Sequence, residues 1–238
     1  MARVPDQGES RGRLRPRDAA TLVLVDRSDS ALRVLMGRRH VGHKFMPGKF
    51  VFPGGAVDPA DRRMAVAAPL DEVLVEKLLA RTAHRSPGYA RALALAAIRE
   101  TFEETGLALG VTDHGAPPHP PEGAWTRFAE TGVFPTLEGL DFLARAITPP
   151  GRPRRFDARF FVADARWIAH RADGVIHADA ELTELVWVPL EEALKLEIPN
   201  ITRSVLGDLA ALGSGPLSLR RPRKFYRMVR GKYVVEEI

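Results

Sequence analysis

Three glutamates within the stretch Arg99–Leu107 constrain this chain more than any other feature of its sequence. The stretch reads Arg-Glu-Thr-Phe-Glu-Glu-Thr-Gly-Leu, and helical spacing brings Glu100, Glu103 and Glu104 onto one face. Carboxylates this close repel one another, which raises at least one pKa, and a divalent cation that prefers oxygen ligands relieves the repulsion. The pattern indicates a site for Mg²⁺ or Mn²⁺, although a solvated acidic helix face has the same spacing.

The residues around these glutamates predict a helix with defined ends. Ser86 and Pro87 suit the N-cap and the first helical position, and Gly106 suits the left-handed residue that ends a helix. Arg99 lies one helical turn before Glu103 and can pair with it. Opposite the glutamates, three apolar side chains are expected to face a core: Leu95, Ile98 and Phe102.

A second motif lies upstream at residues 52–61, which read Phe-Pro-Gly-Gly-Ala-Val-Asp-Pro-Ala-Asp. Together the two motifs resemble the box of the Nudix hydrolase superfamily, which runs Gly, five residues, Glu, seven residues, then Arg-Glu-aliphatic-any-Glu-Glu-any-Gly-aliphatic. Asp61 stands where the family has Glu, and Thr101 stands where it usually has an aliphatic residue. Between Asp61 and Arg99 lie 37 residues instead of seven, so the box carries a 30-residue insertion.

The resemblance implies an α/β fold, the Nudix-type α/β/α sandwich with a mixed β-sheet, and a metal-dependent hydrolase. It places the metal on Glu100, Glu103 and Glu104 together with the carbonyl of Gly54, and it gives Glu100 and Glu103 a part in catalysis. Within the superfamily the chain is most similar to the branch of coenzyme A diphosphatases with a long insertion inside the box. That similarity covers about residues 20–212.

Further site residues are expected outside the box. Many Nudix enzymes carry a base or an extra metal ligand downstream, and here Glu181 or Glu184 is the candidate, with Glu184 preferred; a surface glutamate is the alternative. Arg38 and Arg39 follow a strand and are assigned to phosphate contact, although exposed arginines are often merely solvated. Phe52, which leads into the glycine turn, is assigned to substrate binding.

Composition narrows the class of protein. A chain of 238 residues with 45% hydrophobic residues can bury a full core. The absence of cysteine excludes disulfides, thiolate metal sites and cysteine nucleophiles. No apolar run has the length of a membrane span, and the start lacks the apolar segment of a secretory signal. We expect a soluble cytoplasmic protein without a membrane partner.

The net charge of +5 is concentrated at the two ends of the chain, with five arginines in residues 1–17 and a basic cluster over residues 220–232. A basic surface attracts anionic partners. No groove-reading motif accompanies these charges, and aromatic residues are few among them, so we expect no specific nucleic-acid partner.

The remaining elements follow from local patterns. Residues 1–18 are expected to form a flexible basic tail, and residues 19–238 a single domain with a helical insertion at about 62–87. This insertion is expected to pack beside the site and to influence substrate choice. Strands are expected at 20–26 and 32–38 as a hairpin, and at 154–163, 185–188 and 224–235; helices are expected at 69–83, 138–146, 190–196 and 201–212.

The predicted function is hydrolysis of a diphosphate linkage in a nucleoside diphosphate derivative, with coenzyme A or an acyl-coenzyme A as the first candidates. ADP-ribose, NADH or a dinucleoside polyphosphate would suit the same chemistry. An alternative of another class is a non-catalytic Nudix-fold protein that binds nucleic acid or regulates another process; the three intact glutamates speak against it. The expected partner is a small nucleotide-derived molecule, and the sequence leaves the oligomeric state open, a homodimer included.

Overall fold

The predicted hairpin of two apolar strands is present. In the computed structural model, which describes residues 14–29, 31–43, 46–213 and 221–238, β1 (Arg17–Asp26) pairs antiparallel with β2 (Arg33–Arg39). Most of β1 is buried because it lies inside the sheet, which explains its nearly continuous apolar sequence. The strand begins two residues inside the expected tail, and the first thirteen residues of that tail lie outside the described part of the chain.

The strands form a mixed sheet, as predicted. Seven of the described strands follow one another in the order β11, β10, β6, β7, β1, β2, β3, while β4 pairs with β1 and β9 pairs with β2. The pairs β1–β7 and β10–β6 are parallel, and the other pairs of this sheet are antiparallel. The bounds are β3 Phe50–Val51, β4 Gly54–Ala56, β6 Leu140–Ile147, β7 Phe156–Asp164, β9 Leu182–Pro189, β10 Lys224–Val229 and β11 Lys232–Glu237.

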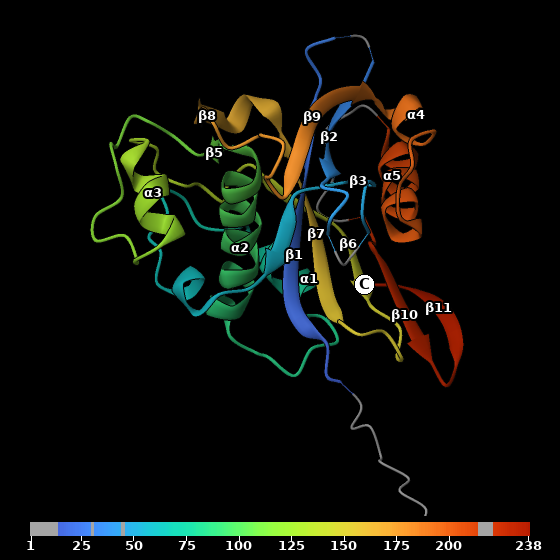
Figure 1. Cartoon of the computed structure of the whole chain (residues 1–238). Helices are drawn as coiled ribbons and strands as arrows, with labels where there is room; N and C mark the ends of the chain where they lie inside the picture. The colour runs from blue at the N-terminus through green and yellow to red at the C-terminus, as the bar shows by residue number, and fades with distance from the viewer. Residues whose placement is uncertain (1–13, 30, 44–45, 214–220) are drawn as a thin grey trace, which may run out of the picture.

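Helices cover both faces of this sheet (Figure 1). The side chains of β1 alternate between two cores, with Leu22 and Leu24 in one and Val23 and Val25 in the other. The first core contains side chains from α1 (Glu72–Leu79), α2 (Pro87–Thr105) and α3 (Ala124–Glu130). The second contains side chains from α4 (Leu190–Ala193) and α5 (Asn200–Leu212). The predicted α/β/α layering is therefore confirmed.

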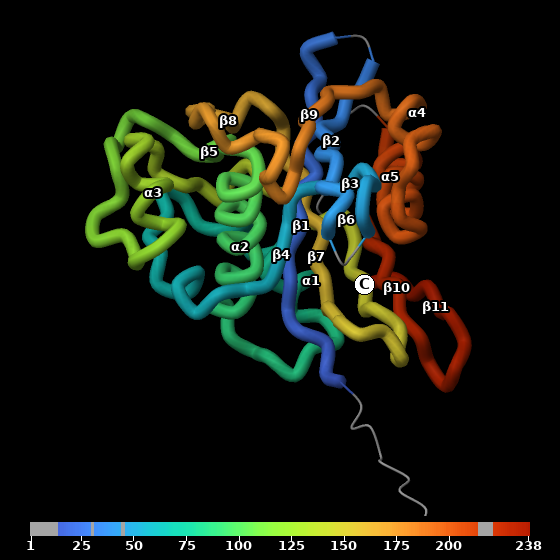
Figure 2. The backbone as a smooth tube through the Cα atoms, in the orientation of Figure 1, coloured from blue at the N-terminus to red at the C-terminus, as the bar shows by residue number. Residues whose placement is uncertain are grey.

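The box helix α2 begins and ends where the sequence predicts. The hydroxyl of Ser86 accepts a hydrogen bond from the backbone N–H of Gly88, and Pro87 occupies the first turn. Gly106 ends the helix in the left-handed conformation with φ of 76°. Beyond it, β5 (Leu107–Leu109) pairs with β8 (Ile168–Arg171) beside the C-terminal end of the helix (Figure 2).

Two element predictions at the C-terminal half of the chain were wrong. The helix expected at 138–146 is strand β6, which is buried through Ala146 between β7 and β10. Its leucines and alanines favour a helix locally, but burial on both faces of a sheet overrides that preference. The single strand expected at 224–235 is a hairpin, because Arg230 and Gly231 both adopt positive φ and form a tight turn. Helix α3 was not predicted.

The insertion contains the predicted helix, α1, but lies away from the glutamates. Leu74 and Leu78 of α1 are buried in the core that α2 also lines. Arg91, in the first half of α2, donates a hydrogen bond to the carbonyl of Arg62 at 3.1 Å. Glu103 lies twelve residues further along the helix, which corresponds to about 18 Å. This contact of the insertion therefore lies at the first half of α2, and its expected position beside the site stays a prediction.

The basic C-terminal cluster is partly internal. Arg223 is only 2% exposed and donates to Asp141 at 3.1 Å, and Arg227 pairs with Glu236 at 2.6 Å. These guanidinium groups support the sheet rather than form an open cationic surface; residue 220 of the cluster lies outside the described residues. Within the part of the chain that the structure covers, no helix is long and apolar enough to cross a membrane.

Candidate active site

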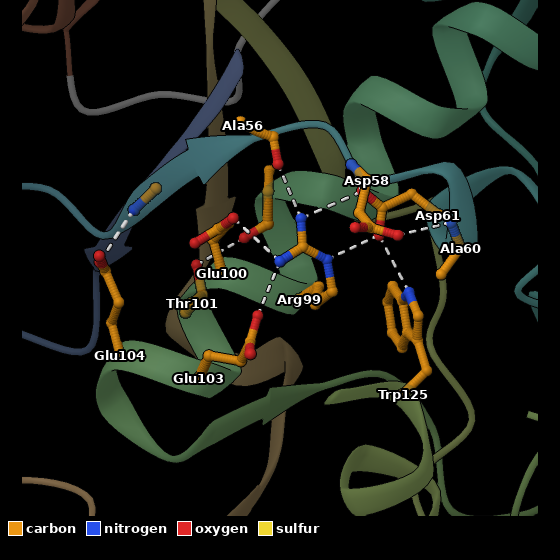
Figure 3. Close-up of polar contacts among 12 residues, drawn as sticks. Ala56, Asp58, Ala60, Asp61, Arg99, Glu100, Thr101, Glu103, Glu104 and Trp125 are labelled. Atoms are coloured by element: carbon orange, nitrogen blue, oxygen red, sulfur yellow. Dashed lines mark hydrogen bonds and ion pairs between the residues drawn. The ribbon is translucent and has the colours of Figure 1, made fainter. Parts of the chain in front are cut away.

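Arg99 joins the two halves of the motif (Figure 3). Its Nε and Nη2 donate to Asp61 at 2.7 and 3.1 Å, and Nη2 also donates to the carbonyl of Ala56 at 2.8 Å. Its Nη1 donates to Glu100 at 2.9 Å and to Glu103 at 2.7 Å. Burial lowers the pKa of Arg99, but the bonds and charges of these carboxylates outweigh it and hold the pKa above its ordinary value.

Asp61 anchors Arg99, although its side chain is shorter than the glutamate of the motif that the sequence resembles. It is fully buried, in the short 3₁₀ helix Pro59–Arg62. Besides Arg99, its carboxylate accepts hydrogen bonds from the backbone N–H of Asp58 at 2.8 Å and from Nε1 of Trp125 at 2.9 Å. The insertion therefore does not separate the two parts of the motif in space.

Glu104 lies apart from the Arg99 cluster and points toward β4 (Figure 3). Its Oε2 accepts a hydrogen bond from the backbone N–H of Gly54 at 3.0 Å. Burial raises the pKa of Glu104 well above its ordinary value; the charge of Glu181 raises it further, and the Gly54 bond opposes the shift. A buried carboxyl group with a raised pKa is typical of functional sites.

Glu100 approaches the backbone of the glycine turn. A Cβ atom on Gly55 would lie 2.5 Å from the carboxylate of Glu100, so only glycine permits this approach. Burial raises the pKa of Glu100, and Arg99 acts in the opposite direction. Thr101, the second departure from the family pattern, is buried and donates its hydroxyl to the carbonyl of Ala97 at 2.7 Å, which satisfies it inside the helix.

The donor set suits a hard divalent cation, although it is not gathered as it stands. In the described part of the chain no three acidic or histidine side chains converge closely enough to hold a metal ion. Arg99 draws Glu100 and Glu103 to itself, while Gly54 holds Glu104. Each of Glu100 and Glu104 uses one carboxylate oxygen in these contacts, and the second oxygen has no partner among the described residues. Oxygen donors beside a turn that only glycine can form fit Mg²⁺ or Mn²⁺.

Arg39 and Glu181 lie near this carboxylate face. Nη2 of Arg39 donates to Glu181 at 2.7 Å. Both groups act on the pKa of Glu104, Glu181 raising it and Arg39 lowering it, which places them within electrostatic reach of that carboxyl. Nε of Arg39 is buried and has no hydrogen-bond partner among the described residues. Arg39 therefore brings a positive charge to the neighbourhood of Glu104.

Three predicted site residues, Arg38, Glu184 and Phe52, belong to the opposite face of the sheet. Nε of Arg38 donates to Glu184 at 2.9 Å, and the guanidinium lies 4.6 Å from the ring centroid of Phe50, which is part of the core beneath α5. Phe52 is 5% exposed in that same core. Strand alternation explains why Arg38 lies on the face opposite Glu104. Arg38 is two residues from Met36, so the two side chains share a face, and that of Met36 packs under α5. The geometry does not bring these residues to Glu104.

A surface pocket of about 350 Å³ adjoins the site. Glu103 and Arg127 of α3 both line it, and Nη2 of Arg127 donates to Glu103 at 3.4 Å. Apolar and polar side chains share the lining, among them Phe102, Glu130, His170 and Val175. Arg127 and Trp125 were missed by sequence reasoning, because α3 lies outside both motifs.

Comparisons with known proteins agree with this arrangement. No protein-family model matches the chain. A Caenorhabditis elegans protein that carries the name nudix hydrolase 7 is 27% identical over 187 residues, which is 75% of this chain but only 53%, about half, of that relative's length. The crystal structure of a NUDIX hydrolase from Alicyclobacillus acidocaldarius is 30% identical, with a TM-score of 0.62 over 87% of this chain and 99% of the other.

The layered mixed sheet and the split arginine-glutamate motif define a Nudix-type hydrolase. With 30% identity across nearly the whole of a solved NUDIX hydrolase, the chain belongs to the Nudix hydrolase family.

Proposed function

We propose that this chain hydrolyses a diphosphate linkage in a nucleoside diphosphate derivative with the help of Mg²⁺ or Mn²⁺. The observation that carries the proposal is the placement of Arg99, which binds Asp61 from the first motif and both Glu100 and Glu103 from the second. An insertion of 30 residues has left this connection intact. A chain that had lost hydrolysis would not be expected to retain a fully paired set of this kind.

The reaction needs charge neutralisation, because the negative oxygens of a diphosphate repel a nucleophile. A divalent cation held by Glu100, Glu103, Glu104 and the carbonyl of Gly54 would neutralise phosphate charge and lower the pKa of a bound water. In this proposal Arg99 orients Glu100 and Glu103, and Gly54 orients Glu104 through its N–H. Arg39, whose Nη2 holds Glu181, is the proposed contact to a phosphate oxygen of the substrate.

Glu181 replaces Glu184 as the proposed proton acceptor. Glu181 is within electrostatic reach of Glu104 and is held by Arg39, whereas Glu184 pairs with Arg38 on the α5 side of the sheet. A carboxylate beside the metal-binding glutamates is suited to take a proton from the attacking water. Glu100 and Glu103 are assigned to catalysis through their contact with the cation.

The pocket beside Glu103 is proposed to receive the organic part of the substrate. Its volume of about 350 Å³ is suited to part of a nucleotide-sized molecule, and its mixed lining offers both apolar contact and hydrogen-bonding groups. Coenzyme A and acyl-coenzyme A are the first candidates because of the insertion and the motif similarity. ADP-ribose, NADH and dinucleoside polyphosphates contain the same linkage and remain alternatives.

A hydrolysis screen tests the proposal. The purified protein is incubated with Mg²⁺, with Mn²⁺ or with a chelator, over coenzyme A, acyl-coenzyme A, ADP-ribose, NADH and dinucleoside polyphosphates, and products are identified by mass. We expect cleavage between two phosphorus atoms for at least one compound, only when metal is present. Metal-independent cleavage, or none with any compound, would contradict the proposal; tight oligonucleotide binding in that case would favour the nucleic-acid alternative.

A further inference from the structure

We propose that Trp125, which lies outside both motifs, is a positioning residue for the metal-binding glutamates and acts through Asp61 and Arg99. The inference rests on the proposed function. Nε1 of Trp125 donates to Oδ1 of Asp61 at 2.9 Å, and the side chain is fully buried. This indole is therefore a polar anchor supplied by α3 to a carboxylate of the motif (Figure 3).

The indole ring is held firmly enough to act in this way. It packs edge to face on Phe128, with ring centroids 5.3 Å apart, and Phe128 packs in the same manner on Phe102 of α2 at 5.2 Å. Edge-to-face aromatic packing fixes the orientation of the rings. Because Nε1–H has a single direction in a fixed ring, it defines where Oδ1 of Asp61 lies.

Asp61 transmits that position to Arg99. Its Oδ1 accepts from both Trp125 and Nε of Arg99, and its Oδ2 accepts from the N–H of Asp58 and from Nη2 of Arg99. Four donors on two oxygens leave the carboxylate little freedom to rotate. The aspartate is one methylene shorter than the family's glutamate, and the indole bond provides an additional constraint that the family motif does not contain.

Arg99 passes the constraint to the glutamates because its guanidinium is planar and rigid. The edge formed by Nε and Nη2 binds Asp61, and Nη1 binds Glu100 and Glu103. If Asp61 turns, the whole plane turns, and Nη1 loses its alignment with both glutamates. Loss of the indole N–H is therefore expected to weaken cation binding without removing any cation ligand.

The test is Trp125→Phe, which keeps an aromatic ring against Phe128 but has no N–H donor. Mn²⁺ affinity is measured by titration calorimetry without substrate, and folding is checked by the unfolding midpoint. We expect a folded variant whose Kd for Mn²⁺ is about tenfold higher than that of the wild type, at the lower end of the effects seen when partners of metal ligands are removed. Trp167→Phe is the matched control, because Trp167 packs against Gly139 and is expected to leave the Kd unchanged.

A second substitution tests the coupling between Trp125 and Asp61. Asp61→Glu introduces the family residue; its additional methylene is expected to displace the carboxylate toward the indole, and the smaller ring in Trp125→Phe is expected to relieve this. Asp61→Glu alone is expected to weaken Mn²⁺ binding, and the double variant is expected to bind more tightly than either single variant, so that the two effects are not additive. If the indole serves only the packing of α3, folded Trp125→Phe is expected to have a lower unfolding midpoint and an unchanged Kd for Mn²⁺.

The outcomes are distinct. A wild-type Kd in folded Trp125→Phe, or additive effects in the double variant, would overturn the role of Trp125 while leaving the proposed function intact. Absence of Mn²⁺ binding by the wild type would overturn the proposed function itself. If Trp125→Phe does not fold, the indole ¹⁵N–¹H signal of Trp125 in the wild type is followed during a Mg²⁺ titration. A saturable shift supports the coupling, and an unchanged signal refutes it.

Discussion

Glu104 shows at the scale of one residue how a functional group can oppose the stability of the fold. It is 8% exposed, and burial is the main reason that its pKa lies well above the ordinary value of 4.5. Between pH 4.5 and the pKa of Glu104 in the folded protein, the carboxyl group of Glu104 is ionised in the unfolded chain but still protonated in the folded chain. The unfolded state binds fewer protons there, so Glu104 makes stability fall as pH rises through this window.

Glu104→Gln is therefore expected to stabilise the metal-free protein. The amide oxygen can still accept the hydrogen bond of Gly54, and no charge has to be buried. The gain in unfolding temperature over the wild type is expected to be larger at pH 7 than at pH 4, measured by calorimetry in chelator. Saturating Mg²⁺ is expected to raise the midpoint of the wild type more than that of the variant. A variant less stable than the metal-free wild type at pH 7 would be inconsistent with this interpretation.

Glu181 and Glu184 provide a matched pair of substitutions three residues apart. Glu181 acts on Glu104, whereas Glu184 pairs with Arg38 at an exposed position on the other face of the sheet. Glu181→Gln is expected to lower kcat about a hundredfold, in the range of a general base, and to change the pH dependence of kcat. Glu184→Gln is expected to leave kcat within about twofold, because exposed ion pairs contribute little. The reverse ranking would restore Glu184 as the base.

Among the elements, a glycine-to-alanine substitution is expected to have opposite effects in the glycine turn at β4 and in the interior of α5. A Cβ on Gly55 would lie 2.5 Å from the carboxylate of Glu100, whereas a Cβ on Gly207 would meet no atom within 4 Å. Gly55→Ala is expected to displace Glu100 and to reduce metal-dependent activity at least about tenfold. Gly207→Ala is expected to stabilise the protein by about 0.5–1 kcal/mol without changing activity. Urea unfolding and initial rates measure both; full activity of Gly55→Ala would argue against close packing of the turn on Glu100.

The sequence predicts elements well where local chemistry determines them. The ends of α2 follow from Ser86, Pro87 and Gly106, each of which has a conformational reason to be there. The helix expected at 138–146 failed because β6 is specified by its neighbours β7 and β10, which lie far away in sequence. A run of leucine and alanine carries no information about such partners.

The sequence predicts the residues of the box helix in the candidate site, but not how they are paired or which residues outside the motifs join them. Helical spacing correctly places Glu100, Glu103 and Glu104 on one helix, but it does not show that Arg99 binds two of them and the backbone of Gly54 binds the third. The faces of β2 were assigned less well: alternation sends Arg38 and Arg39 to opposite faces, and the packing of Met36 under α5 shows which face Arg38 takes. Trp125 carried no signal in the sequence, since its role depends on the packing of α3.

At the scale of the whole molecule, the insertion is part of the main core. Leu74 is fully buried in the core shared with α2, and the backbone carbonyl of Ala80 accepts from Arg145 of β6 at 3.0 Å. The segment therefore supports the sheet and the first half of α2. Its removal is expected to prevent folding rather than to alter substrate choice.

Leu74→Ala tests this structural role. Truncation of a fully buried leucine leaves a cavity and is expected to cost about 2–5 kcal/mol of unfolding free energy. Val235→Ala is the control, because Val235 is 48% exposed on β11 and its truncation is expected to cost well under 1 kcal/mol. Denaturant unfolding measures both. A loss below about 1 kcal/mol for Leu74→Ala would indicate that the insertion is peripheral.

We propose that the carboxylate face of α2 holds the divalent cation with which this chain hydrolyses a diphosphate. The most direct measurement is the rate of Mg²⁺-dependent hydrolysis of the best substrate from the screen by the wild type, Glu104→Gln and Glu184→Gln at matched concentrations of folded protein. We expect Glu104→Gln to lose at least about a hundredfold in rate and Glu184→Gln to retain wild-type activity. Undiminished hydrolysis by folded Glu104→Gln would contradict it.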